Sequence, residues 1–352
     1  MKKISLLSLV LCIFFVPFAF ASSFGIGITP DVNVGTVNPE VWQCDGRVVL
    51  AGNTAPGRIS PGDELISRMN NYAFEGEQVV WRTLVYHPNG ISNAIQDVVV
   101  RLDSVNSYSV STGPICSLTY LAASETVDAS CNAIVNGQPY TVASSGVSAY
   151  YDCIFTVSNT SYGEYWLEVV VTDNNGNEII APNVEYWFLN PVVGLGIDGS
   201  LAFDNVVPGS TVYSQSLLVE NLADAGSGVM LDMFISGSDF YDSSSSGALC
   251  PTSNVLSLSN WAYRAFNGAY STNTDIRADA YGYIQINPAT SFNPTAFYDS
   301  HEIMQLVPFG PYYLANVLAP GAEFVLTFRL DVPQPCIGNF DSGSIFFWGQ
   351  AI

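Results

Sequence analysis

Apolar and polar residues alternate along much of this chain, and no long stretch repeats with the 3.6-residue period of a helix. The alternating segments, such as 78–86, 165–172 and 323–331, are rich in Val, Ile, Tyr, Phe, Trp and Thr. Successive side chains of a strand point to opposite faces of a sheet, so this pattern predicts half-buried β-strands. We therefore expect an all-β fold, with helix confined to short pieces such as 62–70.

The predicted strands are short and are separated by turn-forming residues. They lie at 47–50, 78–86, 97–102, 115–121, 151–158, 165–172, 184–189, 194–197, 212–220, 229–236, 281–287, 323–331 and 344–348. Asn-Gly accepts the positive φ angles of tight turns, so His87–Gly90 and Asp173–Gly176 are predicted hairpin turns. Short, evenly spaced strands favour stacked antiparallel sheets of the immunoglobulin-like sandwich type, with a closed barrel as the alternative.

An internal repeat suggests two related domains. Gly25–Ile28 recurs as Gly194–Ile197, and the apolar residues that follow each motif also correspond. A length of 352 residues suits two domains of ordinary size. We predict a signal peptide at 1–21, one immunoglobulin-like domain at 22–191, and a second at 192–352 that carries a long aromatic-rich insertion at about 237–320.

The first 21 residues have the three parts of an export signal. Lys2 and Lys3 precede the apolar run Ile4–Val16, and Ala19-Phe20-Ala21 is a small-residue cleavage site. An uncleaved membrane anchor is the alternative interpretation. We expect a protein that is secreted and located outside the cell, at the cell surface, with no transmembrane segment after cleavage.

The charge balance excludes several kinds of partner. The chain has 31 Asp and Glu against 10 Lys and Arg, which gives a formal net charge of −21. Nucleic acids and anionic lipids need clustered cations, so neither is an expected partner. Only two histidines are present, His87 and His301, which argues against a multi-histidine metal site.

Export also changes how the cysteines are interpreted. Six cysteines follow the signal, and an even number in an exported chain predicts disulfides. The predicted domain boundary leaves Cys250 and Cys336 as the one possible pair within the second domain. The other four allow three pairings, which the sequence leaves open: Cys44, Cys116, Cys131 and Cys153.

Several segments resemble the paired strands of poorly characterised secreted Ig-like surface proteins of small-genome archaea. They are Tyr72–Trp81, Tyr162–Trp166, Glu185–Pro191, Gly228–Tyr241 and Gly343–Gly349. The resemblance covers most of residues 24–352. It implies an exported β-sandwich surface protein, and it implies no activity and no catalytic residues.

Calcium is the one metal that the sequence suggests, and no other cofactor is expected. Asp173, Asn175 and Glu178 resemble part of an oxygen-ligand loop, with Gly176 at its turn. A plain hairpin turn is the alternative. Asp239 and Asp242, which precede a serine run, are further acids that an extracellular protein can use for calcium.

Aromatic residues between 261 and 313 form the second candidate site. Aromatic faces bind sugars and anchor protein interfaces, whereas the alternative is a satellite core beneath a long insertion. The candidate binding residues are Trp261, Tyr263, Tyr281, Tyr283, Tyr312 and Tyr313.

Two further features bear on assembly at a cell surface. Phe24, Ile26 and Ile28 alternate with glycines, so this segment can add as a strand to a sheet edge of its own domain or of a neighbour. Asn159-Thr160-Ser161 is an acceptor sequence for N-glycosylation.

These observations predict a non-catalytic structural or adhesive protein, such as a surface-layer or filament-type subunit. Its partners would be other surface proteins or further copies of itself, with glycans as a further class of partner. An extracellular glycan- or ligand-binding module is the alternative. A hydrolase ranks last, because the chain has no nucleophile-elbow motif and His301 follows Asp299-Ser300 without a flanking signature.

Overall fold

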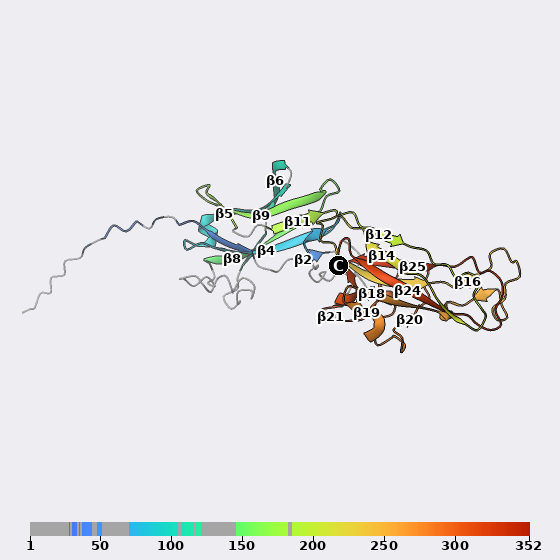
Figure 1. Cartoon of the computed structure of the whole chain (residues 1–352). Coiled ribbons are helices and arrows are strands. Elements are labelled where there is room, and N and C mark those ends of the chain that lie inside the picture. The colour runs from blue at the N-terminus through green and yellow to red at the C-terminus, as the bar shows by residue number, and fades with distance from the viewer. Residues whose placement is uncertain are drawn as a thin grey trace, which may run out of the picture. The chain divides into compact units, whose positions relative to one another are not determined.

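The structure is a computed structural model that describes residues 28, 30–33, 35, 37–43, 48–50, 70–104, 107–115, 117–120, 146–181 and 185–352. Residues 37–352 form one compact unit, and its strands are labelled in Figure 1. The signal peptide, most of the expected helix at 62–70, and Cys44, Cys116 and Cys131 lie outside the described residues.

Residues 40–189 contribute two sheets. The first has the order β1 (Glu40–Gln43), β4 (Gln78–Tyr86), β8 (Ser148–Thr156), β7 (Ser117–Tyr120), and β2 (Val48–Leu50) also pairs with β4. The second has the order β3 (Tyr72–Ala73), β11 (Glu185–Leu189), β9 (Gly163–Asp173), β5 (Ile95–Ser104), β6 (Ser107–Ile115), and β10 (Glu178–Ile180) pairs with β9. These pairs are antiparallel, except that β3 runs parallel to β11.

Residues 195–351 contribute a larger and a smaller sheet. The larger has the order β12 (Leu195–Asp198), β14 (Leu217–Asn221), β24 (Glu323–Asp331), β18 (Trp261–Asn267), β19 (Tyr270–Ser271). Strands β13 (Thr211–Tyr213) and β20 (Ile284–Gln285) pair with β24 and β18. The smaller has the order β23 (Val317–Leu318), β15 (Leu231–Gly237), β25 (Ile345–Ala351).

Short elements connect these sheets. Two hairpins are formed by β16 (Phe240–Tyr241) with β17 (Val255–Leu256) and by β21 (Pro308–Phe309) with β22 (Tyr312–Tyr313). The described helices are single turns: α2 (Ile91–Ala94), α4 (Pro294–Phe297), and the 3-10 turns η1 (Leu258–Asn260), η2 (Thr272–Thr274) and η3 (Leu314–Asn316). None of these helices has the length and hydropathy needed to cross a bilayer.

Each pair of sheets encloses an apolar core. Between the sheets of 40–189, Trp81 and Trp187 meet edge to face with ring centroids 5.3 Å apart. Between the sheets of 195–351, Phe324 and Phe328 of β24 face Leu231 and Met233 of β15 in one buried cluster. Alternating residues of each strand fill these cores, as period-2 patterning requires.

The prediction of an all-β fold with stacked antiparallel sheets is confirmed, and β4 and β24 have the predicted bounds. The predicted strand 212–220 is two short strands, β13 and β14. The hairpin predicted at His87–Gly90 was wrong, because that turn leads through α2 into β5, which lies in the other sheet. The turn at Asp173–Gly176 does join the antiparallel strands β9 and β10.

The segment 237–320 contributes more than a peripheral insertion. It supplies β18, which pairs with β24 over six residue positions in the middle of the larger sheet. The predicted boundary near residue 191 stays a prediction, because Val37–Ile352 clusters as one unit. Tyr72 and Phe188 pack in the same apolar cluster as the core of 195–351.

Candidate functional site

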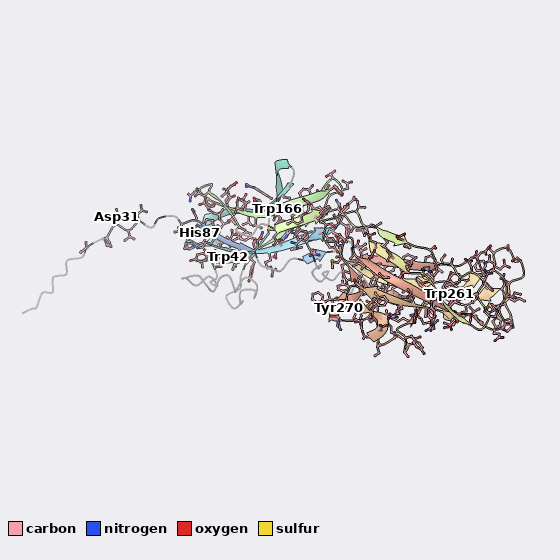
Figure 2. The ribbon with its side chains drawn as sticks, in the orientation of Figure 1. Asp31, Trp42, His87, Trp166, Trp261 and Tyr270 are labelled. Carbon is pink, nitrogen blue, oxygen red and sulfur yellow. A yellow bond between two sulfur atoms is a disulfide. The ribbon has the colours of Figure 1, made fainter. Side chains whose placement is uncertain are left out.

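Trp261 and Tyr263 of β18 lie in the core and not on the surface. Figure 2 labels Trp261 among the side chains of the second half. Trp261 is 5% exposed and stacks on Phe240 with ring centroids 4.7 Å apart. The Tyr263 hydroxyl donates to the backbone oxygens of Glu302 and Ile303 at 3.3 and 3.0 Å, and burial raises the pKa of Tyr263. These two residues therefore belong to the main core of 195–351, and form neither a satellite core nor an exposed binding surface.

Tyr283 lies on the opposite face of the same sheet. Antiparallel pairing places Ile284 opposite Tyr263, so Ile284 points inward and its neighbour Tyr283 points outward. The Tyr283 ring lies 5.0 Å from the Arg329 guanidinium and 5.6 Å from the Tyr213 ring. We name Tyr213, Tyr281, Tyr283 and Arg329 the tyrosine patch.

Asp279 fixes the loop that carries this patch. Its Oδ1 accepts from the backbone N–H groups of Tyr281 and Tyr283 at 2.9 and 3.0 Å, and its Oδ2 pairs with Arg329. Burial raises the pKa of Asp279, but the Arg329 hydrogen bond and the two N–H groups outweigh burial and lower it. The carboxylate is thus held in the charged form that positions both tyrosines.

A glycine between the two tyrosines is required by the backbone. Gly282 has a φ of 83°, and a Cβ there would lie 2.1 Å from the Asn273 side-chain oxygen. The turn leaves Tyr281 74% exposed, whereas Tyr283 is partly exposed. Exposed ring faces beside a guanidinium and a carboxylate can stack on a sugar or anchor a protein partner.

Tyr312 and Tyr313 lie on a separate hairpin, β21–β22, and are partly exposed. The Tyr313 hydroxyl donates to Asp299 Oδ1 at 3.4 Å. At the hairpin tip Phe309 is 52% exposed. This hairpin contributes no residue to the tyrosine patch as defined above.

His301 lines a small cavity of about 210 Å³, together with Tyr263, Arg277, Gln285, Asn287 and Ser300. Its Nδ1 lies 2.7 Å from the Ser300 hydroxyl, and its ring stacks on Phe297 at 4.2 Å. Burial lowers the pKa of His301 and so favours the neutral ring.

Two buried acids near this cavity serve the fold. The Asp275 carboxylate accepts from Arg277 Nε at 3.0 Å and from the Gln305 backbone N–H at 2.7 Å, and it also pairs with the outer guanidinium nitrogen. Glu302 Oε2 accepts from the Asp299 N–H and the Gln305 side-chain amide, each at 3.3 Å. Neither carboxylate lines the cavity.

The structure does not arrange Asp173, Asn175 and Glu178 as a calcium cage. Asp173 Oδ1 accepts from the backbone N–H groups of Asn175 and Asn177, both at 2.8 Å. Glu178 instead pairs with Arg101 at 2.8 Å. In the described part of the chain no group of three potential metal-binding side chains comes together.

Asp242 holds the serine-rich loop in place. Its carboxylate accepts from Ser244 N–H, Ser244 Oγ, Ser246 Oγ and Ala248 N–H at 2.8–3.3 Å. Burial raises the pKa of Asp242. The hydrogen bonds from Ser246, Ser244 and Ala248 outweigh burial and lower the pKa to about 2. The Asp239 Oδ1 likewise accepts from the Leu258 N–H at 2.7 Å.

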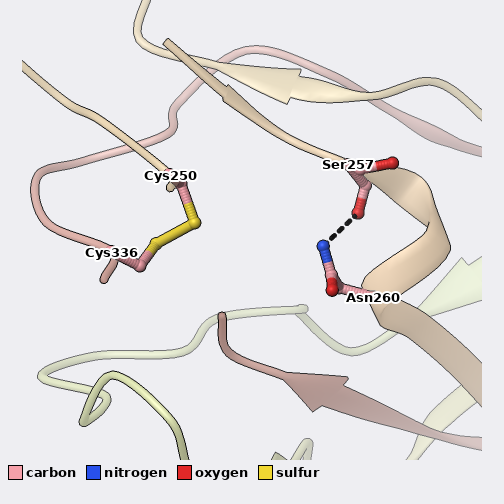
Figure 3. Close-up of a disulfide and its surroundings, with 4 residues drawn as sticks. All are labelled: Cys250, Ser257, Asn260 and Cys336. Carbon is pink, nitrogen blue, oxygen red and sulfur yellow. Dashed lines mark hydrogen bonds between the residues drawn. A yellow bond between two sulfur atoms is a disulfide. The ribbon is translucent and has the colours of Figure 1, made fainter. Parts of the chain in front are cut away.

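Cys250 and Cys336, predicted as a pair, are joined by a disulfide (Figure 3). The bond links residues 86 positions apart, one before β18 and the other after β24. Cys153 is also disulfide-bonded, and the pairing among the four cysteines of the first half lies outside the described residues.

Asn159 of the predicted glycosylation sequence is exposed in the turn between β8 and β9. Ile28 is 91% exposed, whereas Phe24 and Ile26 lie outside the described residues. The donor-strand hypothesis for this segment stays a prediction.

Tyr213, Asp279 and Arg329 were missed by reasoning from the sequence. The spacing Asp279-x-Tyr281-x-Tyr283 was a usable signal, because an Asp side chain commonly accepts from N–H groups two and four residues later. Nothing in the sequence joins Tyr213 or Arg329 to that loop, because their contact depends on the pairing of β13 with β24.

No family model and no curated protein matches this chain. Among solved structures, the chain is similar to the C-terminal domain of the Streptococcus agalactiae AgI/II polypeptide BspA, with 11% identity over 90% of this chain and 97% of that chain and a TM-score of 0.28. It is also similar to the Vibrio cholerae secreted serine protease VesC, with 8% identity over 80% of this chain and 48% of that chain and a TM-score of 0.18. Similarities this weak carry no functional argument, and the resemblance to archaeal surface proteins stays a prediction.

Proposed function

We propose that this chain is an exported, non-catalytic structural or adhesive protein of the cell surface. Its predicted signal peptide supports export, and the Cys250–Cys336 disulfide is typical of proteins in oxidising compartments. Its all-β layers and its excess of acidic over basic residues suit a soluble and rigid surface module.

The observation that carries the proposal is that three buried carboxylates accept hydrogen bonds that hold the fold. Asp173, Asp242 and Asp275 are each at least 95% buried, and each accepts several hydrogen bonds from its own loop or from Arg277. A carboxylate held in this way rigidifies a loop. These acids therefore support a scaffold more directly than they support a reaction.

Immunogold electron microscopy of the native cell envelope tests this function. We expect label over the envelope and recovery of the protein in the envelope fraction. A protein found only as soluble monomer in the culture medium would contradict the surface role.

A glycan-binding module is the second candidate, and the tyrosine patch favours it. Glycan-array binding of the intact chain would be compared with that of Tyr281→Ala and Tyr283→Ala. Tyr241→Ala is the matched control, because Tyr241 is a 49% exposed tyrosine on the separate strand β16. Binding that is lost in the two patch variants and kept in the control supports this candidate, whereas an array without hits removes it.

A further inference from the structure

Among the residues that the structure describes, strand β25 forms an edge of the smaller sheet and pairs on one side only, with β15. On the other edge of β15, Ile235 N–H donates to His301 O at 2.8 Å, and Ile303 N–H donates to Met233 O at 3.2 Å. Met233 and Ile235 therefore direct their backbone groups away from β25.

The register then shows which groups of β25 point outward. Residues opposite each other in an antiparallel pair share the direction of their backbone groups. Gly349 lies opposite Met233, Phe347 opposite Ile235, and Ile345 opposite Gly237. Ile352 N–H donates to Met230 O at 3.0 Å, so the residues of β25 whose backbone groups face β15 are those that alternate with Ile345, Phe347, Gly349 and Ala351. Ile345, Phe347, Gly349 and Ala351 thus present their N–H and C=O groups to the open edge.

This edge lacks the features that normally protect a strand from pairing. Natural edges carry charges, prolines or bulges. The stretch 343–352 contains no charged residue and no proline, in a chain with 31 acids. In the described structure, β15 is the one strand that pairs with β25. The N–H and C=O groups of β25 that point away from β15 make no backbone hydrogen bond there.

On one face of β25, two large side chains precede Trp348 and two small residues follow it at matching distances. If two copies of β25 pair antiparallel around a two-fold axis through Trp348, Phe347 lies opposite Gly349 of the second copy. Ile345 then lies opposite Ala351 of the second copy. Each bulky residue meets a small one on the same face, and all four outward residues find backbone partners.

We propose that β25 is a dimerisation edge whose occupant is the β25 strand of a second copy of this chain. The two three-stranded sheets become one six-stranded sheet, and Ile345, Phe347 and Ala351, which pack only partly against the core, become covered. A contact of this kind is isologous and closes at two subunits. The proposal does not rest on the surface function.

Sedimentation of the full mature chain over a range of concentrations tests the dimer. Phe346→Lys places a charge on the edge, and Phe346 belongs to neither apolar core cluster of the second half, so the fold should tolerate it. We expect this variant to weaken dimerisation at least about tenfold. Phe309→Lys, at the exposed hairpin tip, is the matched control and should leave the dimer unchanged.

A proline pair tests the direction of the backbone groups. Ala351→Pro removes an outward N–H, so the monomer should fold normally and fail to dimerise. Gln350→Pro removes an inward N–H, so its melting temperature should fall. A chain that is monomeric at every soluble concentration would overturn the proposal. So would a dimer unaffected by Phe346→Lys, or open-ended oligomers of the kind that head-to-tail addition of the N-terminal segment produces.

Discussion

Two tyrosines of the same aromatic segment have opposite roles. Tyr263 is 1% exposed and donates to backbone oxygens within the core, whereas Tyr283 contacts Arg329 and Tyr213 on the outer face. Tyr263 lies on β18, and Tyr283 directly precedes β20, whose Ile284 lies opposite Tyr263. Which face of the sheet a side chain occupies, and not its residue type, decides whether it stabilises the fold or remains available to a ligand.

The largest expected effect tests Tyr263, the buried tyrosine of this comparison. Tyr263→Ala should lower the free energy of unfolding by about 3–5 kcal/mol, because it leaves a cavity in the core. Tyr263→Phe keeps the ring and should cost only about 1 kcal/mol for the lost hydrogen bond. Chemical denaturation measures both. A Tyr263→Ala variant as stable as the parent chain would show that β18 is not part of the core.

The disulfide should have the next largest effect, because it links the segments that flank β18 and β24. In the chain-entropy model, closing a loop of this length contributes about 4 kcal/mol. A variant with Cys250→Ala and Cys336→Ala should therefore lose hydrogen-exchange protection first in residues 195–351. Unchanged protection there would show that the strand pairing does not depend on this cross-link.

Asp242 extends the comparison from a buried tyrosine to a buried carboxylate. Its pKa is lowered to about 2 in the folded chain, against about 3.9 in an unfolded one, so its stabilising effect is present above about pH 4 and is lost as the pH falls through about 2. The melting temperature of Asp242→Asn should lie below that of the parent at pH 5, and the difference should shrink at pH 2. A difference that stays constant with pH would assign the effect to shape and not to charge.

The smallest expected effect on stability tests Tyr283, the tyrosine on the outer face. Tyr283→Ala should change the free energy of unfolding by no more than about 0.5 kcal/mol, because the ring packs on the surface. Denaturation measured beside Tyr263→Ala makes the contrast direct. A loss as large as that of Tyr263→Ala would mean that the patch supports the fold and is not a free surface.

Part of this fold followed from local patterns. The composition and alternation of 78–86 and 323–331 predicted β4 and β24, and Asn175-Gly176 predicted the turn between β9 and β10. Strand β18 was missed because Trp261–Asn267 lies in a long segment of turns and serines, where the pattern favoured an insertion. Its strand conformation depends on pairing with β24, some 60 residues later in the chain.

The candidate site was less predictable than the fold. The aromatic residues were found, but which of them are buried was not, because alternation gives two faces without saying which one meets the second sheet. Asp173 was a calcium candidate with a plain hairpin turn as the alternative, and the structure gives its oxygens to the N–H groups of that turn. Acids in turns compete for the nearest donors, and sequence spacing alone does not separate a turn from a ligand loop.

By itself, the sequence determined the all-β class, the acidic character and the prediction of export, because these follow from local patterning, from charge counts and from the first 21 residues. Only the tertiary structure decided that Trp261 and Tyr263 are buried, that Tyr213, Tyr283 and Arg329 meet, and that β25 lies at an edge of its sheet in the described part of the chain. These outcomes depend on strand pairings between residues far apart in the chain, and local patterning does not specify such pairings.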